Sequence, residues 1–277
     1  MPTPQLSIKL NDGHEMPRLG FGVWQIANAA TVEAVKAAIG AGYRLIDTAA
    51  AYGNEAGTGE AVRDAGVPRE ELYVTTKLWN DSHGHGEALR AFDASVKLLG
   101  LDSLDLYLIH WPIPRLDRYV DTWRALVRLR EEGRVKSIGV SNFNAEQIQR
   151  LADETGEVPA VNQVELHPMF QQTALRSFHA QHGIVTEAWS PLGRAKILED
   201  ETLVAVARKH GRTPAQVVLR WHLDNGIVAI PKSVSPQRMR ENIDLLGFEL
   251  DGDDLAQIAR LDDTNGRVGP DPASFPV

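Results

Sequence analysis

The feature that most constrains the fold is a regular alternation of short β-rich runs with longer amphipathic segments, from about residue 20 to about residue 233. In the segments between the runs, apolar residues recur three or four positions apart, so these segments are predicted to be helices packed outside the strands. The alternation is typical of a parallel α/β fold. The predicted strands are Leu19 to Gly22, Arg44 to Asp47, Tyr73 to Lys77, Leu104 to His110, Lys136 to Ser141, Ala160 to Glu165, Ile184 to Ser190 and Ile227 to Ser233.

Eight strand and helix units in 277 residues predict a TIM (β/α)8 barrel, a fold that routinely forms one domain of this length. No linker interrupts the pattern, so a single domain is expected over residues 1–277. Before the first barrel strand, Leu6 to Pro17 is predicted to form a β-hairpin that turns at Asn11-Asp12-Gly13 and caps the barrel floor. Thr213-Pro214-Ala215-Gln216 and Ser235-Pro236 are predicted helix starts.

The alternative architecture is an open doubly wound sheet, whose dinucleotide-binding form needs G-x-G-x-x-G between its first strand and helix. The nearest match, Gly57-Thr58-Gly59, follows the second β-rich run and has Val62 where the third glycine would fall. We therefore interpret it as an ordinary helix start. A P-loop and a G-x-S-x-G elbow are also missing from the sequence.

Composition excludes several functions. Because the chain has no cysteine, it cannot form disulfides, thiolate metal sites or a cysteine nucleophile. The 29 basic and 37 acidic residues give a net charge of -8, which argues against nucleic acid or an anionic membrane as partner. The N-terminus does not look like a secretion signal, and no apolar run approaches the ~18 residues of a spanning helix, so a cytoplasmic location is expected.

Polar and aromatic residues end the predicted strands, which is where a barrel gathers its active site. Asp47 ends the second run with Tyr52 just beyond it, Lys77 ends the third and His110 ends the fourth. Their spacing is close to one strand and helix unit, so we expect them to converge on one rim. Other strand ends carry Ser141, Asn142 and Lys232, and the tryptophans that follow strand ends and could wall a pocket are Trp24, Trp79, Trp111 and Trp189.

The chemistry of this rim follows from Lys77. A lysine that closes an apolar run would be partly buried and would need a carboxylate partner, which Asp47 can supply. A lysine beside Tyr52 favours the phenolate and so lowers a pKa that is about 10 when unperturbed. Tyr52 then becomes a usable acid, while His110 could hydrogen-bond a substrate carbonyl. An acid without a nucleophile or metal suits hydride transfer, and the hydride must come from a cofactor.

Other histidines are interpreted as structural. His83-Gly84-His85 lacks a further ligand at metal-binding spacing and is expected to be a solvated loop. The pair His179 and His182 likewise gives no indication of a metal site. No metal site is therefore expected.

The rim residues stand in segments that resemble the aldo-keto reductases over nearly the whole chain. The matching segments are Leu45-Ile46-Asp47-Thr48-Ala49, Tyr52-Gly53-Asn54-Glu55, Thr75-Thr76-Lys77-Leu78-Trp79, Leu108-Ile109-His110-Trp111-Pro112, Gly139-Val140-Ser141-Asn142-Phe143, Asn162-Gln163-Val164-Glu165, Trp189-Ser190-Pro191-Leu192-Gly193 and Ile230-Pro231-Lys232-Ser233. Within the family the chain is most similar to bacterial 2,5-diketo-D-gluconate reductases.

The resemblance implies an enzyme that reduces the carbonyl group of small aldehydes, ketones or keto-sugars with NADPH and that acts as a monomer. It implies a catalytic tetrad of Asp47, Tyr52, Lys77 and His110. The implied cofactor residues are Ser141, Asn142, Gln163 and Trp189 at the nicotinamide, Ser190, Leu192 and Gly193 at the pyrophosphate, Lys232, Ser233 and Arg238 at the 2′-phosphate, and Glu241 and Asn242 at the adenine. The implied substrate residues are Trp24, Trp79, His110 and Trp111.

Two departures from the family matter. Trp189 stands where many members have tyrosine, which preserves stacking on the nicotinamide. The sequence ends at Val277 without the long C-terminal loop of animal aldose reductases, so an open substrate mouth and a wide substrate range are expected.

Three other functions compete with this interpretation. A cofactor-binding sensor or partner protein could share the fold and have little turnover. A barrel glycosidase would need two carboxylates, for which Asp47 and Glu165 are the candidates, and Asp47 is better explained by Lys77. A Schiff-base aldolase through Lys77 is disfavoured because Asp47 would keep the amine protonated.

Overall fold

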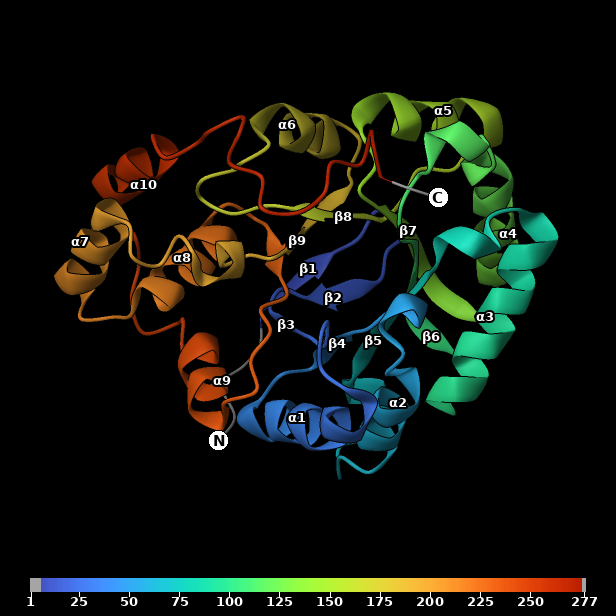
Figure 1. Cartoon of the computed structure of the whole chain (residues 1–277), viewed down its shortest axis with the longest axis horizontal. Coiled ribbons are helices and arrows are strands. Elements are labelled where there is room, and N and C mark those ends of the chain that lie inside the picture. Colours follow the sequence, from blue (N-terminus) through green and yellow to red (C-terminus); the bar gives the residue numbers. More distant parts are fainter. Residues whose placement is uncertain (1–5, 276–277) are drawn as a thin grey trace.

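The computed structural model describes residues 6–275, and a barrel of eight parallel strands forms its centre (Figure 1). The strands are β3 (Gly20–Gly22), β4 (Leu45–Asp47), β5 (Tyr73–Leu78), β6 (Leu104–Ile109), β7 (Val135–Ser141), β8 (Val161–Glu165), β9 (Val185–Trp189) and β10 (Val228–Ala229). Each strand pairs with the next in parallel. A parallel bridge between Leu19 and Ala229 joins the first strand to the last, so the predicted TIM barrel is confirmed.

The helices form a ring outside the strands (Figure 1). They are α1 (Asn28–Ala41), α2 (Glu55–Arg63), α3 (His85–Leu99), α4 (Tyr119–Glu131), α5 (Ala145–Thr155), α6 (Thr173–Gln181), α7 (Glu201–His210), α8 (Pro214–Asp224), α9 (Pro236–Ile243) and α10 (Gly252–Ala259). Both predicted helix starts are confirmed. Thr213 forms a capping box with Gln216, and the Ser235 hydroxyl accepts a hydrogen bond from the Arg238 amide. Within the described residues, no helix combines the length and the apolar character needed to cross a membrane.

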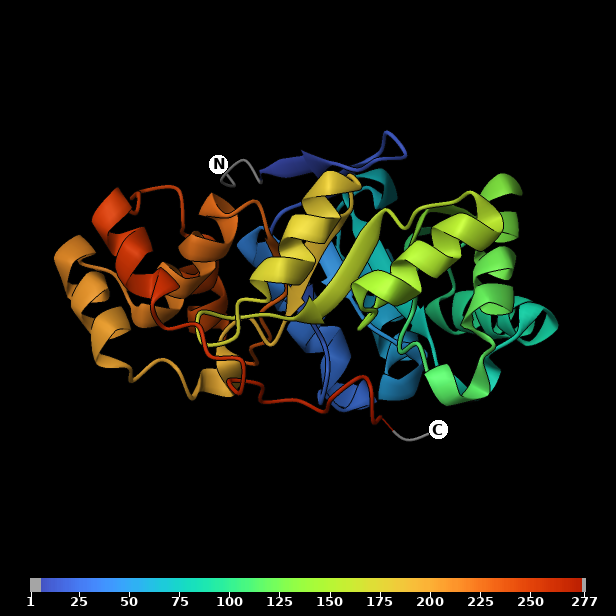
Figure 2. The ribbon, with the colours of Figure 1, turned by 90° about the horizontal axis from the view of Figure 1, so that it is seen from above.

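A hairpin closes the lower end of the barrel, as the sequence predicted. Strands β1 (Ser7–Lys9) and β2 (Glu15–Pro17) pair antiparallel, with Ile8 opposite Met16. Figure 2 shows the hairpin on one side of the molecule and the C-terminal segment on the opposite side. Leu10 and Met16 are buried in the same apolar cluster as Leu45 and Leu106. The apolar side of the hairpin therefore closes the lower end of the barrel interior. The candidate active site must lie at the upper end.

The predicted length of the last strand is wrong. The sequence predicted Ile227 to Ser233, whereas β10 contains only Val228 and Ala229. Pro231 has no N–H and cannot continue a ladder. Its carbonyl instead accepts a hydrogen bond from Gly22 at 3.1 Å, after which the chain leaves the barrel toward α9. Lys232 and Ser233 consequently lie in a loop beyond the strand end.

The glycines of Gly57-Thr58-Gly59 lie inside α2, where this helix packs between α1 and α3. A Cβ at Gly57 would lie 2.5 Å from the carbonyl oxygen of Asn28 in α1. A Cβ at Gly59 would overlap the carbonyl oxygen of Leu99 at the end of α3. These glycines allow close helix packing, which agrees with the prediction that they are not a dinucleotide-binding motif.

This packing predicts that Gly59→Ala destabilises the fold by roughly 1–3 kcal/mol, because backbone must move to admit the methyl group. Gly40→Ala is the matched control, since Gly40 is an exposed residue of α1 with open space around its Cα. That change should stabilise the protein by up to about 1 kcal/mol through helix propensity. Urea denaturation followed by circular dichroism measures both values. Equal stability of the two variants would contradict the packing argument.

Candidate active site

The upper end of the barrel brings together the residues that the sequence placed on one rim. Asp47 is the last residue of β4, Lys77 is the penultimate residue of β5 and His110 follows β6 directly. Tyr52 ends a short 3-10 turn, Ala50–Tyr52, that comes after β4. The buried amide of Asn54 fixes this turn, since it accepts a hydrogen bond from Thr48 at 2.8 Å and donates to the carbonyl oxygens of Val23 and Ile26, both at 2.9 Å.

The Lys77–Asp47 ion pair predicted from the sequence lies at the centre of this group. The Lys77 ammonium donates to Asp47 Oδ1 at 2.6 Å and to the carbonyl oxygen of Thr48 at 2.9 Å. The side chain of Lys77 is 0% exposed. Burial lowers the pKa of Lys77, but its surroundings, the Asp47 carboxylate first, more than offset this effect, so that the net pKa is raised. Lys77 is therefore a fixed positive charge inside the barrel.

Tyr52 lies against this positive charge. The Lys77 ammonium is 5.2 Å from the centroid of the Tyr52 ring. The net direction of the Tyr52 pKa differs from the sequence-based expectation: burial raises it, and Lys77 lowers it only in part. The expected net lowering is therefore wrong, because desolvation of the phenolate outweighs the attraction of one ammonium. Tyr52 holds its proton at neutral pH, and Lys77 keeps its acidity above what burial alone would leave.

His110 completes the group as a neutral imidazole. Burial and the nearby charge of Lys77 lower the pKa of His110 well below its usual value. Its ring meets the Tyr52 ring edge-on at 5.7 Å between centroids. Trp79 lies edge-on at 5.1 Å, and Trp111 is stacked at 6.2 Å. A neutral imidazole has one N–H donor and one acceptor nitrogen, so it can hydrogen-bond a carbonyl oxygen without carrying charge.

The ends of β7, β8 and β9 form a second set of contacts beside the tetrad. Ser141 donates through its hydroxyl to the Gln163 carbonyl oxygen at 2.8 Å, and Trp189 Nε1 donates to Asn142 Oδ1 at 2.8 Å. The Asn142 amide nitrogen donates to the carbonyl oxygen of His110 at 3.0 Å. These contacts orient Asn142 in a left-handed conformation with φ of 65°.

Gln163 connects this set to the tetrad. Its amide nitrogen donates to Asp47 Oδ2 at 2.8 Å and to Glu187 Oε2 at 2.8 Å. Glu187, a fully buried residue of β9, was not predicted from the sequence as a site residue. A usable signal was present, because an acidic residue inside a predicted buried strand shares the inward face with Trp189 two positions later.

The remaining predicted cofactor residues follow β9 and β10. Ser190, Leu192 and Gly193 lie in the loop after β9, and the guanidinium of Arg194 in this loop lies 5.1 Å from the Trp24 ring. Lys232 and Arg238 are exposed, and neither forms an ion pair with any residue between 6 and 275. Along the same segment Ser233 accepts a hydrogen bond from the Ser235 amide at 3.1 Å, Glu241 accepts from Gln237 at 2.7 Å, and Asn242 is buried.

The C-terminal segment covers one side of the predicted substrate mouth, so the expectation that this mouth is open is wrong on that side. The ring of Phe275 stacks on Trp111 with centroids 3.9 Å apart and meets Trp79 edge-on at 6.2 Å. A short segment reaches this position because Glu165 fixes its path across the barrel. The Glu165 carboxylate accepts hydrogen bonds from the amides of Val268 and Gly269, the latter at 3.0 Å. Trp24, at 39% exposed, remains open to solvent.

These contacts also decide against the glycosidase alternative. Burial raises the pKa of Glu165, but the contact with His167 and the hydrogen bonds from the amides of Val268 and Gly269 outweigh it, and the net pKa is lowered. Glu165 is thus a carboxylate that anchors the C-terminal segment, and Asp47 is bound by Lys77. Neither carboxyl group is free to act as the acid or base of such a pair.

His83 lies inside the protein, so the interpretation of His83-Gly84-His85 as a solvated loop is wrong for its first residue. His83 is 2% exposed, whereas His85 is exposed. His83 lies between the 3-10 turn Asn80–Ser82 and the start of α3, and its burial there could not be seen from the short motif. His179 is a hydrogen-bonded core histidine, with Asn162 at 3.0 Å and Thr186 at 2.8 Å. In residues 6–275 no three His, Asp or Glu side chains are grouped as a metal site would require.

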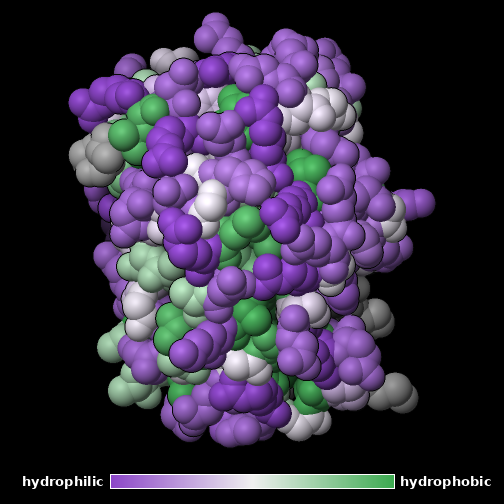
Figure 3. All heavy atoms as spheres, turned by 90° about the vertical axis from the view of Figure 1, so that its right-hand side faces the viewer, coloured by the Kyte–Doolittle hydropathy of each residue, from purple (hydrophilic) through white to green (hydrophobic). Residues whose placement is uncertain are grey.

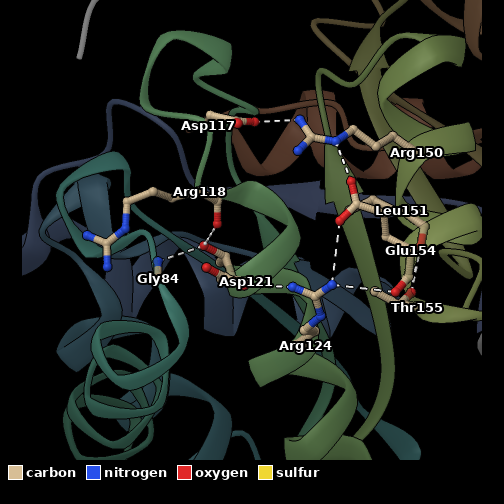
Figure 4. A network of polar contacts seen from close by, with 10 residues as sticks. Gly84, Asp117, Arg118, Asp121, Arg124, Arg150, Leu151, Glu154 and Thr155 are labelled. Carbon is tan, nitrogen blue, oxygen red and sulfur yellow. Dashed lines mark hydrogen bonds and ion pairs between the residues drawn. The ribbon is translucent and has the colours of Figure 1, made fainter.

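A cavity of about 530 Å³ lies on the same face of the barrel, outside the tetrad. It is bounded by α5, the loop after β6 and the C-terminal segment. Figure 4 shows the ionic network beside it: Arg150 bridges Asp117 and Glu154, and Arg124 bridges Glu154 and Asp121. The network holds the loop after β6 against α5. The face seen in Figure 3 is mostly hydrophilic, with hydrophobic residues in groups between hydrophilic ones.

Comparison with known proteins gives the family. The aldo/keto reductase family model matches residues 18–263. An aldo-keto reductase of Mycolicibacterium smegmatis is 54% identical over 268 residues, which are 97% of each chain. The methylglyoxal reductase DkgA of Escherichia coli is 52% identical over 270 residues, again 97% of each chain.

Solved structures agree with this result. A variant of the protein Gox0644, crystallised in complex with NADPH, has a TM-score of 0.96 and 52% identity, and the match covers 99% of this chain and 100% of that one. An aldo/keto reductase of Brucella melitensis has a TM-score of 0.91 and 54% identity over 94% of this chain and all of its own. The resemblance inferred from the rim motifs is confirmed, and the chain belongs to the aldo/keto reductase family.

Proposed function

We propose that this protein reduces the carbonyl group of small aldehydes, ketones or keto-sugars to an alcohol with NADPH, and that Asp47, Tyr52, Lys77 and His110 are its catalytic residues. The observation that carries the proposal is the buried Lys77–Asp47 pair beside Tyr52 and His110. Similarity to a methylglyoxal reductase supports a small oxoaldehyde as one substrate. Residues 1–277 form one domain in this proposal, and the protein acts as a cytoplasmic monomer without nucleic acid or membrane partners.

The residues present fit NADPH. Lys232 and Arg238 are cations without an ion-pair partner in the described chain, on the two sides of the start of α9, and a phosphate can bind such a pair. Trp189 presents a half-buried indole whose Nε1 is already bound by Asn142. NADPH supplies the hydride when it is bound. Its proposed contacts are Ser141, Asn142, Gln163 and Trp189 at the nicotinamide, Ser190, Leu192 and Gly193 at the pyrophosphate, Lys232, Ser233 and Arg238 at the 2′-phosphate, and Glu241 and Asn242 at the adenine.

The protein's own residues then supply the proton and the orientation. Tyr52 donates its phenolic proton to the carbonyl oxygen, and the Lys77 charge stabilises the phenolate that forms. Asp47 balances and orients Lys77. Neutral His110 directs the carbonyl oxygen through a hydrogen bond. The aromatic wall of Trp24, Trp79 and Trp111, with Phe275 against it, limits the access of water and of bulky groups.

Tyr52→Phe should lower turnover by roughly 10²- to 10⁴-fold while leaving NADPH affinity nearly unchanged, because the ring stays and only the proton donor is lost. Lys77→Met should do similar damage by raising the pKa of the phenol that remains. The losses in the double variant should not add, since both changes disable one donor. Turnover of methylglyoxal is followed by NADPH absorbance, and affinity by quenching of tryptophan fluorescence.

If Tyr52→Phe kept wild-type turnover while Lys77→Met lost it, the acid would have to be another group, with His110 as the first candidate. Binding of NADPH by the wild type without turnover of any aldehyde would instead favour the sensor alternative.

Replacing Lys232 and Arg238 by glutamine should weaken NADPH binding far more than NADH binding, because only NADPH carries the 2′-phosphate. Arg240→Gln is the matched control, since Arg240 is also exposed on α9 and forms no ion pair with the described residues. Fluorescence titrations with both cofactors measure the ratio of the two dissociation constants. An equal loss for both cofactors would place the phosphate elsewhere.

Phe275→Ala should raise kcat/KM for a bulky aromatic ketone by roughly tenfold or more relative to methylglyoxal, because it uncovers Trp111. Leu98→Ala, which removes an exposed apolar side chain of α3, should leave that ratio unchanged. Steady-state rates on the two substrates give the comparison. A wild type that prefers bulky ketones and leaves small aldehydes unreduced would contradict the proposed substrate class.

A further inference from the structure

Glu187 is a buried acid beside the tetrad that the proposed mechanism does not use. It stands in β9, with Gln163 opposite in β8 and Val228 opposite in β10. Its side chain is 0% exposed. A buried acid in a barrel interior costs free energy unless its surroundings stabilise it, so its contacts indicate its role.

The contact of Glu187 is shared with a catalytic residue. The Gln163 amide nitrogen has two hydrogens, and it donates to Glu187 Oε2 and to Asp47 Oδ2, each at 2.8 Å. Turning the amide over would place its oxygen against the Asp47 carboxylate, which has no proton to donate. Asp47 therefore fixes which way the amide points, Glu187 accepts its second hydrogen, and the carbonyl oxygen is left for another partner. This oxygen accepts no hydrogen bond from a residue of the described chain.

Burial and the charge of Asp47 favour the neutral form of Glu187, and the charge of Lys77 opposes them only in part. Lys77 is already paired with Asp47, and the other titratable groups that face Glu187 are Tyr52 and Tyr73. The Oε1 atom of Glu187 has no hydrogen-bond partner within residues 6–275. An ionised carboxylate here would bury an unpaired charge. Burial, and next the charge of Asp47, raise the pKa of Glu187 to about 8.

We propose that Glu187 is a positioning residue of the reductase, which holds the Gln163 amide together with Asp47 and, as a neutral acid, keeps the barrel interior beneath the cofactor site free of excess negative charge. The inference rests on the proposed function, in which Gln163 contacts the nicotinamide. When Glu187 ionises in alkali, two effects follow. The new charge raises the pKa of Tyr52, which weakens the proton donor, and it favours the positively charged ring of NADP+ over the neutral ring of NADPH.

The test compares the affinities for NADP+ and NADPH, whose shared phosphates cancel in the ratio. Tryptophan fluorescence titrations of the wild type between about pH 6.5 and about pH 9.5 should show the ratio move toward NADP+ by roughly fivefold or more. Glu187→Gln keeps the shape and one acceptor oxygen but cannot ionise, so its ratio should stay constant. Glu55→Gln is the matched control, because Glu55 is another buried acid, bound to Thr76 at 2.6 Å, and its removal should leave the wild-type pH dependence.

Two further readouts separate positioning from folding. The infrared spectrum of the wild type at neutral pH should contain a protonated carboxyl band that Glu187→Gln lacks and Glu55→Gln retains. Glu187→Ala leaves Gln163 with one partner and should raise KM for NADPH by roughly tenfold or more, with rescue in Glu187→Gln. If the alanine variant does not fold, the glutamine variant decides alone.

An unchanged pH dependence in Glu187→Gln, or a carboxyl band that survives this substitution, would overturn the inference. That result would leave the proposed function intact, provided that the wild type binds NADPH and reduces methylglyoxal. Failure of the wild type to bind either cofactor would reject the proposed function instead.

Discussion

The buried ion pair between Lys77 and Asp47 is the interaction on which the arrangement of the site depends. A lysine that is 0% exposed needs a carboxylate, and β4 and β5 supply it because they are adjacent and parallel. The pair fixes the position of the positive charge beneath the Tyr52 ring. The second oxygen of Asp47 is held by Gln163, four strands away around the barrel. The closure of the barrel therefore brings β8 and β9 within reach of this pair.

The Lys77–Asp47 pair also influences the protonation states of the residues around it. Because the negative charge of Asp47 balances the positive charge of Lys77, a further ionised group in the interior would have no opposite charge to balance it. His110 is accordingly neutral and Tyr52 protonated, and the net pKa of Glu187 is raised. An active site that keeps its tyrosine protonated and its histidine uncharged suits donation of one proton to an oxygen. Desolvation lowers the acidity of the phenol, and the fixed ammonium restores part of it.

The sequence predicted the barrel and the convergence of the rim residues, because both follow from strand alternation and from the rule that strand ends share one rim. It failed where long-range contacts decide. The expected lowering of the Tyr52 pKa was wrong because the degree of burial is not visible in a motif. The expected open mouth was wrong on one side because Glu165 and Phe275 meet partners about 100 to 160 residues away. Glu187 was missed, although its alternation with Trp189 places it on the inward face.

The alternation of inward and outward side chains along β8 places two functionally different residues inside the barrel. Its inward residues are Val161, Gln163 and Glu165, while Asn162 points outward to His179 of α6. Gln163 binds the carboxyl groups beneath the proposed cofactor site, and Glu165 binds the segment that covers the substrate mouth. A shift of β8 by one residue would turn both side chains out of the barrel at once. The register of β8 therefore couples the position of the proposed nicotinamide contact to the cover of the proposed substrate mouth.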